Sequence, residues 1–109
     1  DQEHDYFAAF FKALKPGGVL GIVEHRVKPD ADMASMHKTG YVTEAYVKDI
    51  AQRAGFNFEA ASEINANPKD TTDHPNGIWS LPPSLRSGDE DKYRAIGESD
   101  RMTLRFRKP

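Results

Sequence analysis

Residues 11–23 read FKALKPGGVLGIV and join the end of a helix to a short apolar strand. The Pro-Gly-Gly at positions 16–18 ends the helix, because proline cannot continue it and glycine accepts a positive φ. Residues 19–23 are almost wholly apolar, which is typical of a strand covered on both faces by helices. Gly21 within this run predicts a close approach by another element. Such a helix-to-strand step is half of an alternating α/β pattern.

The segments around this stretch continue the alternation. Residues 1–15 are expected to form a helix, because their large apolar side chains recur at helical spacing: Tyr6, Phe7, Phe10, Phe11 and Leu14. Residues 27–42 have no clean period and predict a loop, with one helical turn near residues 33–37. A second helix is expected to begin after Thr43, a suitable N-cap, and to end at Gly55.

Strands are expected after the second helix and at the end of the chain. Apolar residues alternate with polar ones from Phe56 through Phe58 to Ala60, which predicts a strand. Residues 62–100 form a long connection that is rich in proline and asparagine, with helical turns expected at residues 89–96. A connection of this length is either disordered or functional, and Trp79 gives it something to bury.

The final segment, residues 101–108, alternates cleanly and predicts a half-exposed strand. Because a helix joins the first two strands, they are expected to run parallel. The last strand follows without a strong intervening helix, so it can pair antiparallel.

The composition limits the classes of protein to which the chain can belong. Its 109 residues support one domain, and 15 basic against 17 acidic side chains give a net charge of −2. This balance gives no signal for nucleic-acid binding. No segment approaches the ~20 apolar residues of a membrane span. The absence of cysteine excludes a disulfide scaffold, and the scattered histidines give no metal-site spacing. The composition does not indicate a compartment.

Several motifs together resemble one enzyme family. LKPGG lies at residues 14–18 between helix and strand, and AGF at residues 54–56 lies between the next helix and strand. With a final strand after a long excursion, this order resembles the fifth, sixth and antiparallel seventh strands of class I methyltransferases that use S-adenosylmethionine. Further stretches resemble a bacterial group of predicted methyltransferases: VEHR (23–26), NPKDT (67–71), DHP (73–75), WSLPP (79–83) and GESDRM (97–102).

The resemblance implies an α/β fold, the C-terminal half of a Rossmann-like methyltransferase sheet. Its order would be helix, strand, helix, strand, long loop and antiparallel strand. The implied cofactor is S-adenosylmethionine, with an unknown acceptor. In the family a glycine-rich turn between a strand and a helix holds the cofactor, because backbone N–H groups approach it only where side chains are absent. Gly17 and Gly18 precede a strand and are no substitute. Since the chain also begins at Asp1 without a signal-peptide pattern, we expect a fragment that is inactive alone.

Candidate site residues follow the first strand. Ligands of open α/β sheets bind beyond the carboxyl ends of parallel strands, which points to residues 24–26. His25 is a candidate general base, because imidazole titrates near neutral pH, and Glu24 could orient it. The alternative is a hydrogen-bonded histidine at a strand end. Glu24 and Arg26 are candidate substrate ligands, although neighbouring residues of a strand point to opposite faces.

The long connection supplies a second set of candidates. In the resembled family the corresponding segment walls the acceptor. Candidate substrate ligands here are Asn67, Lys69, Asp70 and Trp79, and His74 is a second candidate base. The alternative is a polar loop that uses Asn, Asp and Pro for turns, with Trp79 packed on the core. Glu98, Asp100 and Arg101 are expected to form an ion-pair cluster.

Two classes of function remain open from the sequence. One is the methyltransferase, and the other is a non-enzymatic α/β ligand-binding or assembly module that lacks the cofactor site. In either case a half-sheet leaves an apolar strand edge. We therefore expect self-association or a partner segment near residues 19–23.

Overall fold

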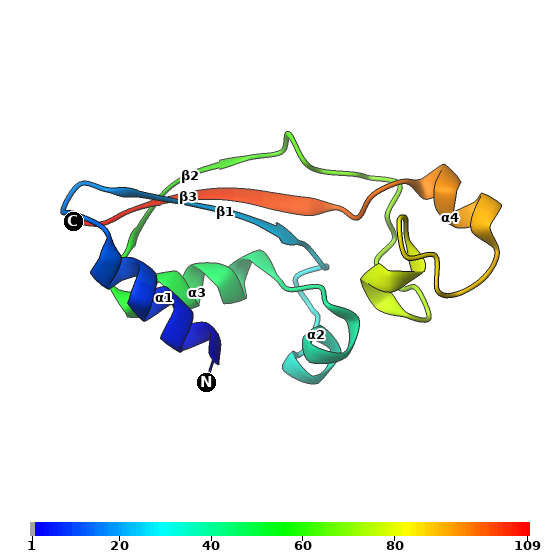
Figure 1. The fold of residues 1–109 in the computed structure, drawn as a ribbon, viewed down its shortest axis with the longest axis horizontal. Coiled ribbons are helices and arrows are strands. Elements are labelled where there is room, and N and C mark those ends of the chain that lie inside the picture. Colours follow the sequence, from blue (N-terminus) through cyan, green and yellow to red (C-terminus); the bar gives the residue numbers. More distant parts are fainter. Residues whose placement is uncertain (1) are drawn as a thin grey trace.

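The computed structural model describes residues 2–109 as an α/β arrangement with helices against one sheet (Figure 1). Its elements are α1 (Gln2–Ala13), β1 (Val19–His25), α2 (Met33–Thr39), α3 (Glu44–Ala54), β2 (Asn57–Ser62), the 3-10 helix η1 (Gly77–Ser80), α4 (Glu90–Ile96) and β3 (Arg101–Arg107). The strands form one sheet in the order β1-β3-β2, with β3 antiparallel to both neighbours. α1 and α3 lie side by side on one face of this sheet.

The core lies between the sheet and these two helices. β3 contributes Met102, Leu104 and Phe106, the three alternate residues predicted to face inward, and each is at most 2% exposed. They pack with residues of α3 and with Phe56, and aromatic residues of α1 pack against this cluster. Phe11 of α1 meets Phe56 edge to face, with 5.1 Å between ring centroids. The predicted core stripe of residues 1–15 is confirmed in part: Phe7, Phe11 and Leu14 pack against the core, whereas Tyr6 and Phe10 are 57% and 41% exposed.

The ends of the helices follow the predicted capping residues. The Thr43 hydroxyl accepts a hydrogen bond from the backbone N–H of Tyr46, and Gly55 ends α3 with a φ of 112°. The single turn expected near residues 33–37 is a longer helix, α2, because Asp32 caps its start and Gly40 its end. Gly97 ends α4, as expected.

Two expectations for β1 are wrong for the part of the chain that the structure describes. Leu20 and Ile22 pack on the core, but Val19 and Val23 on the other face are 45% and 51% exposed, so β1 is covered on one face only. A Cβ added at Gly21 would meet no atom within 4 Å, so no element approaches it closely. The physical reason is that successive side chains point to opposite faces, and the helices cover one face.

The sheet order also refines the expected parallel relation. β1 and β2 both run antiparallel to β3, so they share a direction, but β3 lies between them. The final strand is antiparallel, as predicted. In β2 the alternation is interrupted at Glu59, because Phe58 pairs with Phe106 while Ala60 already pairs with Arg105. This bulge turns Ala60 to the face opposite Phe58, which corrects the predicted alternation.

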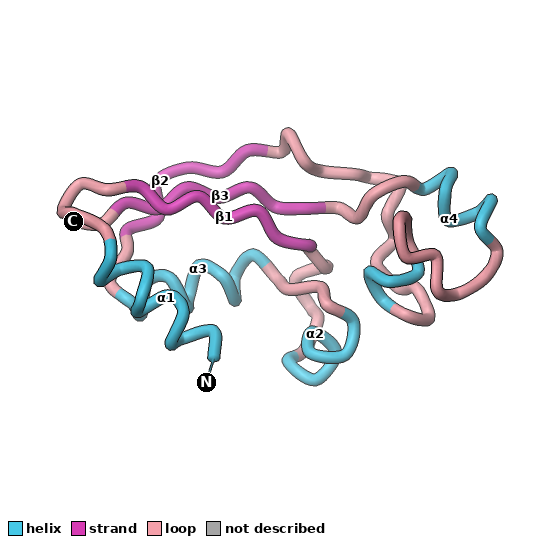
Figure 2. The backbone as a smooth tube through the Cα atoms, in the orientation of Figure 1, coloured by secondary structure: helices cyan, strands magenta, loops and turns pink. Residues whose placement is uncertain are grey.

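The long connection at residues 62–100 forms a lobe beyond the end of the sheet (Figure 2). It contains η1 and α4, and η1 lies against α2. Two glycines allow this contact. A Cβ at Gly77 would collide with the Thr39 backbone, and one at Gly40 would lie 2.7 Å from the Ile78 side chain. The lobe is thus attached to the rest of the domain by close backbone packing.

Replacement of Phe106 tests the core. Phe106→Ala should lower the free energy of unfolding by about 3–5 kcal/mol, because it leaves a cavity in a close-packed interior. Val23→Ala, on the open face of the neighbouring strand, should change it by less than about 1 kcal/mol. Urea denaturation followed by circular dichroism measures both. Equal losses in the two variants would contradict the one-sided core.

Replacement of Gly77 tests the attachment of the lobe. Gly77 and Gly88 both have positive φ, +57° and +72°, but only Gly77 faces a backbone. Gly88→Ala should therefore cost about 1 kcal/mol from backbone strain. Gly77→Ala should cost about 1–3 kcal/mol more, because α2 and η1 must separate. Thermal unfolding compares the two variants, and an equal loss of stability would refute the close contact.

Candidate functional site

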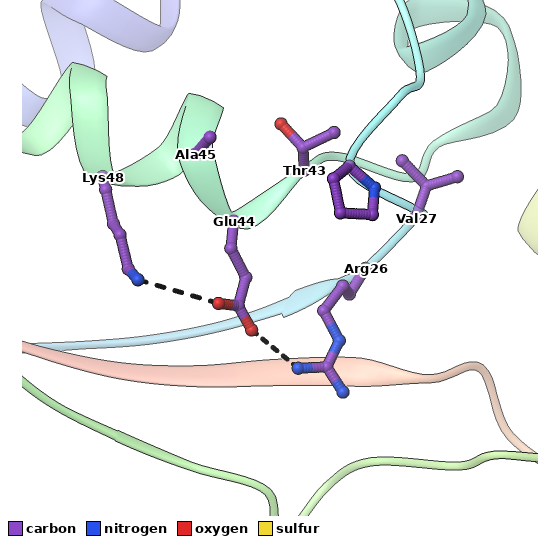
Figure 3. Close-up of a pocket in the computed structure, with 7 residues that line it drawn as sticks. Arg26, Val27, Thr43, Glu44, Ala45 and Lys48 are labelled. Carbon is purple, nitrogen blue, oxygen red and sulfur yellow. Dashed lines mark hydrogen bonds and ion pairs between the residues drawn. The ribbon is translucent and has the colours of Figure 1, made fainter.

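One arginine joins four segments at the carboxyl end of β1. The Arg26 guanidinium makes a two-point contact with the Asp100 carboxylate, Nε to Oδ2 at 2.9 Å and Nη2 to Oδ1 at 3.0 Å. Its Nη1 also donates to Glu44, the first residue of α3, at 2.6 Å and to Glu63, which follows β2, at 2.8 Å. We call these four residues the Arg26 cluster. Figure 3 shows Glu44 between Arg26 and Lys48.

The Arg26 cluster shifts the pKa values of its members. Hydrogen bonds to Asp100 and Glu63 hold the pKa of the Arg26 guanidinium far above its ordinary value. Partial burial tends to raise the pKa of Asp100, but hydrogen bonds from Arg26 and from the Asn67 N–H outweigh it, so this pKa is lowered. Arg26, a predicted substrate ligand, therefore has its guanidinium fully engaged in holding the fold.

A cavity of about 460 Å³ lies beside this cluster (Figure 3). Its charged lining residues are Arg26, Glu44 and Lys48. Glu44 pairs with both cations, at 2.6 Å to Arg26 and 3.7 Å to Lys48. Because these charges satisfy one another, the cavity offers a ligand little with which to form a specific polar contact.

Asp70, another predicted substrate ligand, is a buried structural acceptor. Its side chain is 0% exposed. The carboxylate accepts hydrogen bonds from the Tyr41 hydroxyl at 2.7 Å, from His74 Nε2 at 2.7 Å, and from the backbone N–H groups of Thr72 and Asp100 at 2.9 Å each. Four donors satisfy a buried carboxylate, which removes most of the cost of its desolvation.

The same network encloses His74, the second candidate base. Its side chain is 4% exposed, and its ring lies edge to face against Tyr93, with 5.5 Å between centroids. Burial and the hydrogen bond to Asp70 raise the pKa of Tyr41 far above its ordinary value, so Tyr41 remains a neutral donor. His74 is thus packed inside the lobe.

Asn67 and Lys69 complete the predicted loop set, and they have different surroundings. The Asn67 amide donates to the carbonyls of Ile96, the last residue of α4, and of Glu98, at 2.8 and 2.7 Å. Its carbonyl accepts from the Lys69 backbone N–H at 3.1 Å. The Lys69 side chain is exposed. Asn67 therefore shapes the lobe, as the alternative interpretation of a turn-forming polar loop expects.

Glu24 and His25 face opposite sides of the sheet, as strand geometry predicts. Glu24 lines a groove on the helix side with residues of α1 and α3. Its carboxylate accepts from the His25 backbone N–H at 3.2 Å and makes no contact with the imidazole. The expected orientation of the His25 ring by Glu24 is therefore wrong. Ser99 has that role instead, since its hydroxyl lies 2.5 Å from His25 Nδ1.

The remaining candidates, His25 and Trp79, line one cavity of about 290 Å³, which we call the β1-end pocket. Its lining comes from the end of β1, the start of β3 and the lobe: His25, Trp79, Pro82, Pro83, Glu98 and Arg101 with their neighbours. His25 Nδ1 is held by Ser99, and the structure gives Nε2 no partner within residues 2–109. In the tautomer in which His25 Nδ1–H donates to the Ser99 hydroxyl, Nε2 is the nitrogen that can accept a proton.

Ser99 and Arg101 are site residues that the sequence did not identify. Arg101 is the register partner of His25 across β1 and β3, so their side chains share a face. Its Nη2 donates to Glu98 at 2.6 Å, which confirms part of the predicted ion-pair cluster, while Asp100 pairs with Arg26 instead. The Arg101 Nε is buried without a partner in the described part of the chain. The pairing register of β1 and β3 is the signal that would have placed Arg101 beside His25.

The described residues do not fit S-adenosylmethionine. The two segments that lead from a strand into a helix, residues 26–32 and 63–76, contain no glycine. Side chains at every position would keep the ligand away from the backbone N–H groups that the family uses. Within residues 2–109 no group of three or more His, Cys, Asp or Glu side chains could hold a metal ion.

Comparison of the sequence with family models and with curated proteins finds no match. Over residues 2–109 no helix combines the length and apolar character needed to span a membrane. The chain is therefore characterised by its α/β fold and by the β1-end pocket.

Removal of the Arg26 guanidinium tests the role of the cluster. Arg26→Met should lower the free energy of unfolding at pH 7 by about 2–3 kcal/mol, because it leaves Asp100 and Glu63 without their cation and Glu44 with Lys48 alone. The lowered pKa of Asp100 adds stability that is complete above its ordinary value of 3.8 and is lost as the pH falls below it. This loss in acid should be smaller in Arg26→Met.

Urea denaturation between pH 2.5 and 7 measures both effects. Arg107→Met is the matched control, because Arg107 pairs with Glu59 on the exposed side of the sheet, at 2.6 Å. An exposed pair contributes little. If Arg26→Met and Arg107→Met were equally stable, the cluster would not hold the fold.

Proposed function

We propose that this chain is the acceptor-binding part of a class I methyltransferase that uses S-adenosylmethionine. Its role would be to bind a small acceptor in the β1-end pocket and to take up a proton at His25 Nε2. The cofactor would be held by polypeptide outside residues 1–109, since the residues of this chain do not fit it. No step that involves the cofactor follows from this chain.

The order and pairing of the elements carry the proposal. The motif LKPGG (14–18) leads from α1 into β1, and AGF (54–56) leads from α3 into β2. The last strand returns after a long excursion and pairs antiparallel with β2. These are the features on which the resemblance to the end of a methyltransferase domain rests, and they now occur together in one sheet.

The position of the pocket supports the same function. The family resemblance implies that the long connection walls the acceptor, and residues 78, 79 and 81–84 of the lobe line the β1-end pocket together with His25. The pocket lies at the carboxyl end of β1, where α/β sheets bind ligands. Positioning an acceptor beside a base is the main contribution that a protein makes to such a transfer.

A non-enzymatic ligand-binding or assembly module is the second candidate. The uncovered edge of β1 favours it, because that strand pairs with β3 on one side only and exposes Val19 and Val23. Self-association through this edge, or its pairing with a partner segment, would satisfy the unpaired backbone N–H and C=O groups of β1. Once the edge is covered, the methyltransferase would bind an S-adenosyl ligand and the non-enzymatic module would not.

Calorimetric titration with S-adenosylhomocysteine tests the methyltransferase proposal. The isolated chain should bind with a Kd above the micromolar range. A chain extended at its N-terminus by the roughly 100 residues that complete a domain of ordinary size should bind in that range. Micromolar binding to the isolated chain, or none to the extended one, would refute the proposal that this chain binds the acceptor while other polypeptide binds the cofactor.

His25→Asn in the extended protein provides the matched variant. It should keep S-adenosylhomocysteine binding and lower turnover by about 10²-fold or more, because a positioned base typically contributes that factor. His37→Asn is the control, since His37 lies on α2 with an exposed side chain outside the lining of the β1-end pocket. Unchanged turnover in His25→Asn would remove His25 from the mechanism.

A further inference from the structure

We infer that the β1-end pocket binds a small aromatic acid with a ring hydroxyl, and that its carboxylate pairs with Arg101. The use of this compound as a methyl acceptor rests on the proposed function, whereas its binding does not. The inference is built from three groups in the pocket: a cation, a flat wall and an imidazole.

Arg101 supplies the anion-binding group. Its side chain lines the pocket and is 30% exposed, although Nε itself is covered, so a ligand would meet the guanidinium at its Nη groups. Its present partner Glu98 has a side chain that is 76% exposed, so this ion pair can open at little cost. A guanidinium offers parallel N–H groups that match a carboxylate at two points. The pocket therefore offers a ligand carboxylate a guanidinium whose present partner is easily displaced.

The lobe supplies the flat wall. Trp79, Pro82 and Pro83 line the pocket, with Ile78 and Leu81 beside them. A rigid apolar surface of this kind favours a planar ring over a flexible chain, because stacking buries area without ordering rotatable bonds. At about 290 Å³ the cavity is at the lower end of ligand pockets, which suits a single ring.

His25 supplies the contact to the hydroxyl. Since Ser99 occupies Nδ1, the open Nε2 can accept a hydrogen bond from a ring O–H. The carboxylate and the hydroxyl of one ligand would then be held by register partners on the same face of the sheet. A ligand that lacks either group would lose the contact with Arg101 or the contact with His25.

The fluorescence of Trp79, the single tryptophan of the chain, reports binding directly. Titration with 4-hydroxybenzoate should change it saturably. Phenol, which lacks the carboxylate, should bind roughly tenfold to a hundredfold more weakly, because it cannot form charge-assisted hydrogen bonds with Arg101. Benzoate, which lacks the hydroxyl, should also bind more weakly than 4-hydroxybenzoate.

Variants of Arg101 and Glu98 assign the contact. Arg101→Gln should abolish the preference for 4-hydroxybenzoate over phenol, while Glu98→Gln should tighten 4-hydroxybenzoate by about two- to fivefold by releasing the guanidinium. Arg105→Gln is the matched control. Arg105 lies on the same face of β3 but pairs with Glu59 at 3.3 Å, outside the pocket, so the preference should persist.

Two results would overturn the inference: equal affinities for phenol and 4-hydroxybenzoate in the unaltered chain, or equal losses in Arg101→Gln and Arg105→Gln. The first needs no variant, so it stands even if Arg101→Gln fails to fold. No step uses an S-adenosyl ligand. Binding of 4-hydroxybenzoate without S-adenosylhomocysteine binding to the extended chain would therefore refute the methyltransferase and leave the pocket's ligand class intact.

Discussion

The contact between Arg26 and Asp100 is the constraint on which the rest of the structure depends. It joins the end of β1 to the residue that precedes β3, so a chain segment of more than seventy residues must return to the same point. Glu44 and Glu63 bring α3 and the end of β2 to the same guanidinium. One planar cation thereby sets the relative positions of the strands at the end of the sheet where the pocket opens.

His25, the residue before Arg26, is oriented by the same strand geometry but faces the β1-end pocket. Because adjacent strand residues point to opposite faces, anchoring Arg26 among carboxylates leaves His25 directed at the β1-end pocket. The backbone on both sides of this junction is paired: Arg26 N–H donates to the Asp100 carbonyl, and Val42 N–H donates to the His25 carbonyl. The imidazole is therefore carried on backbone that is held from two directions, which is what a precisely oriented proton acceptor requires.

The sequence predicted local features well because their causes are local. The Thr43 cap, the Gly55 stop and the inward face of β3 depend on a few neighbouring residues. The site was predicted only in part. His25 followed from its place at a strand end, but its partners depend on which residues of β3 lie opposite, and no local pattern encodes that register. The structural role of Asp70 was missed because two of its four donors, the Tyr41 hydroxyl and the Asp100 N–H, come from distant segments.

The two edges of the sheet are not equivalent. Along β2, the bulge and the carboxylate of Glu59, which pairs with Arg105 and Arg107, interrupt the regular ladder that another strand would need. Along β1 the row from residue 19 to 23 is regular and apolar. Growth of a fibre by edge pairing requires that every molecule has two sheet edges that can each pair with another strand. A molecule with only one such edge can pair once and then offers no edge to a further copy. Extension of the sheet therefore leads to a closed complex and not to amyloid.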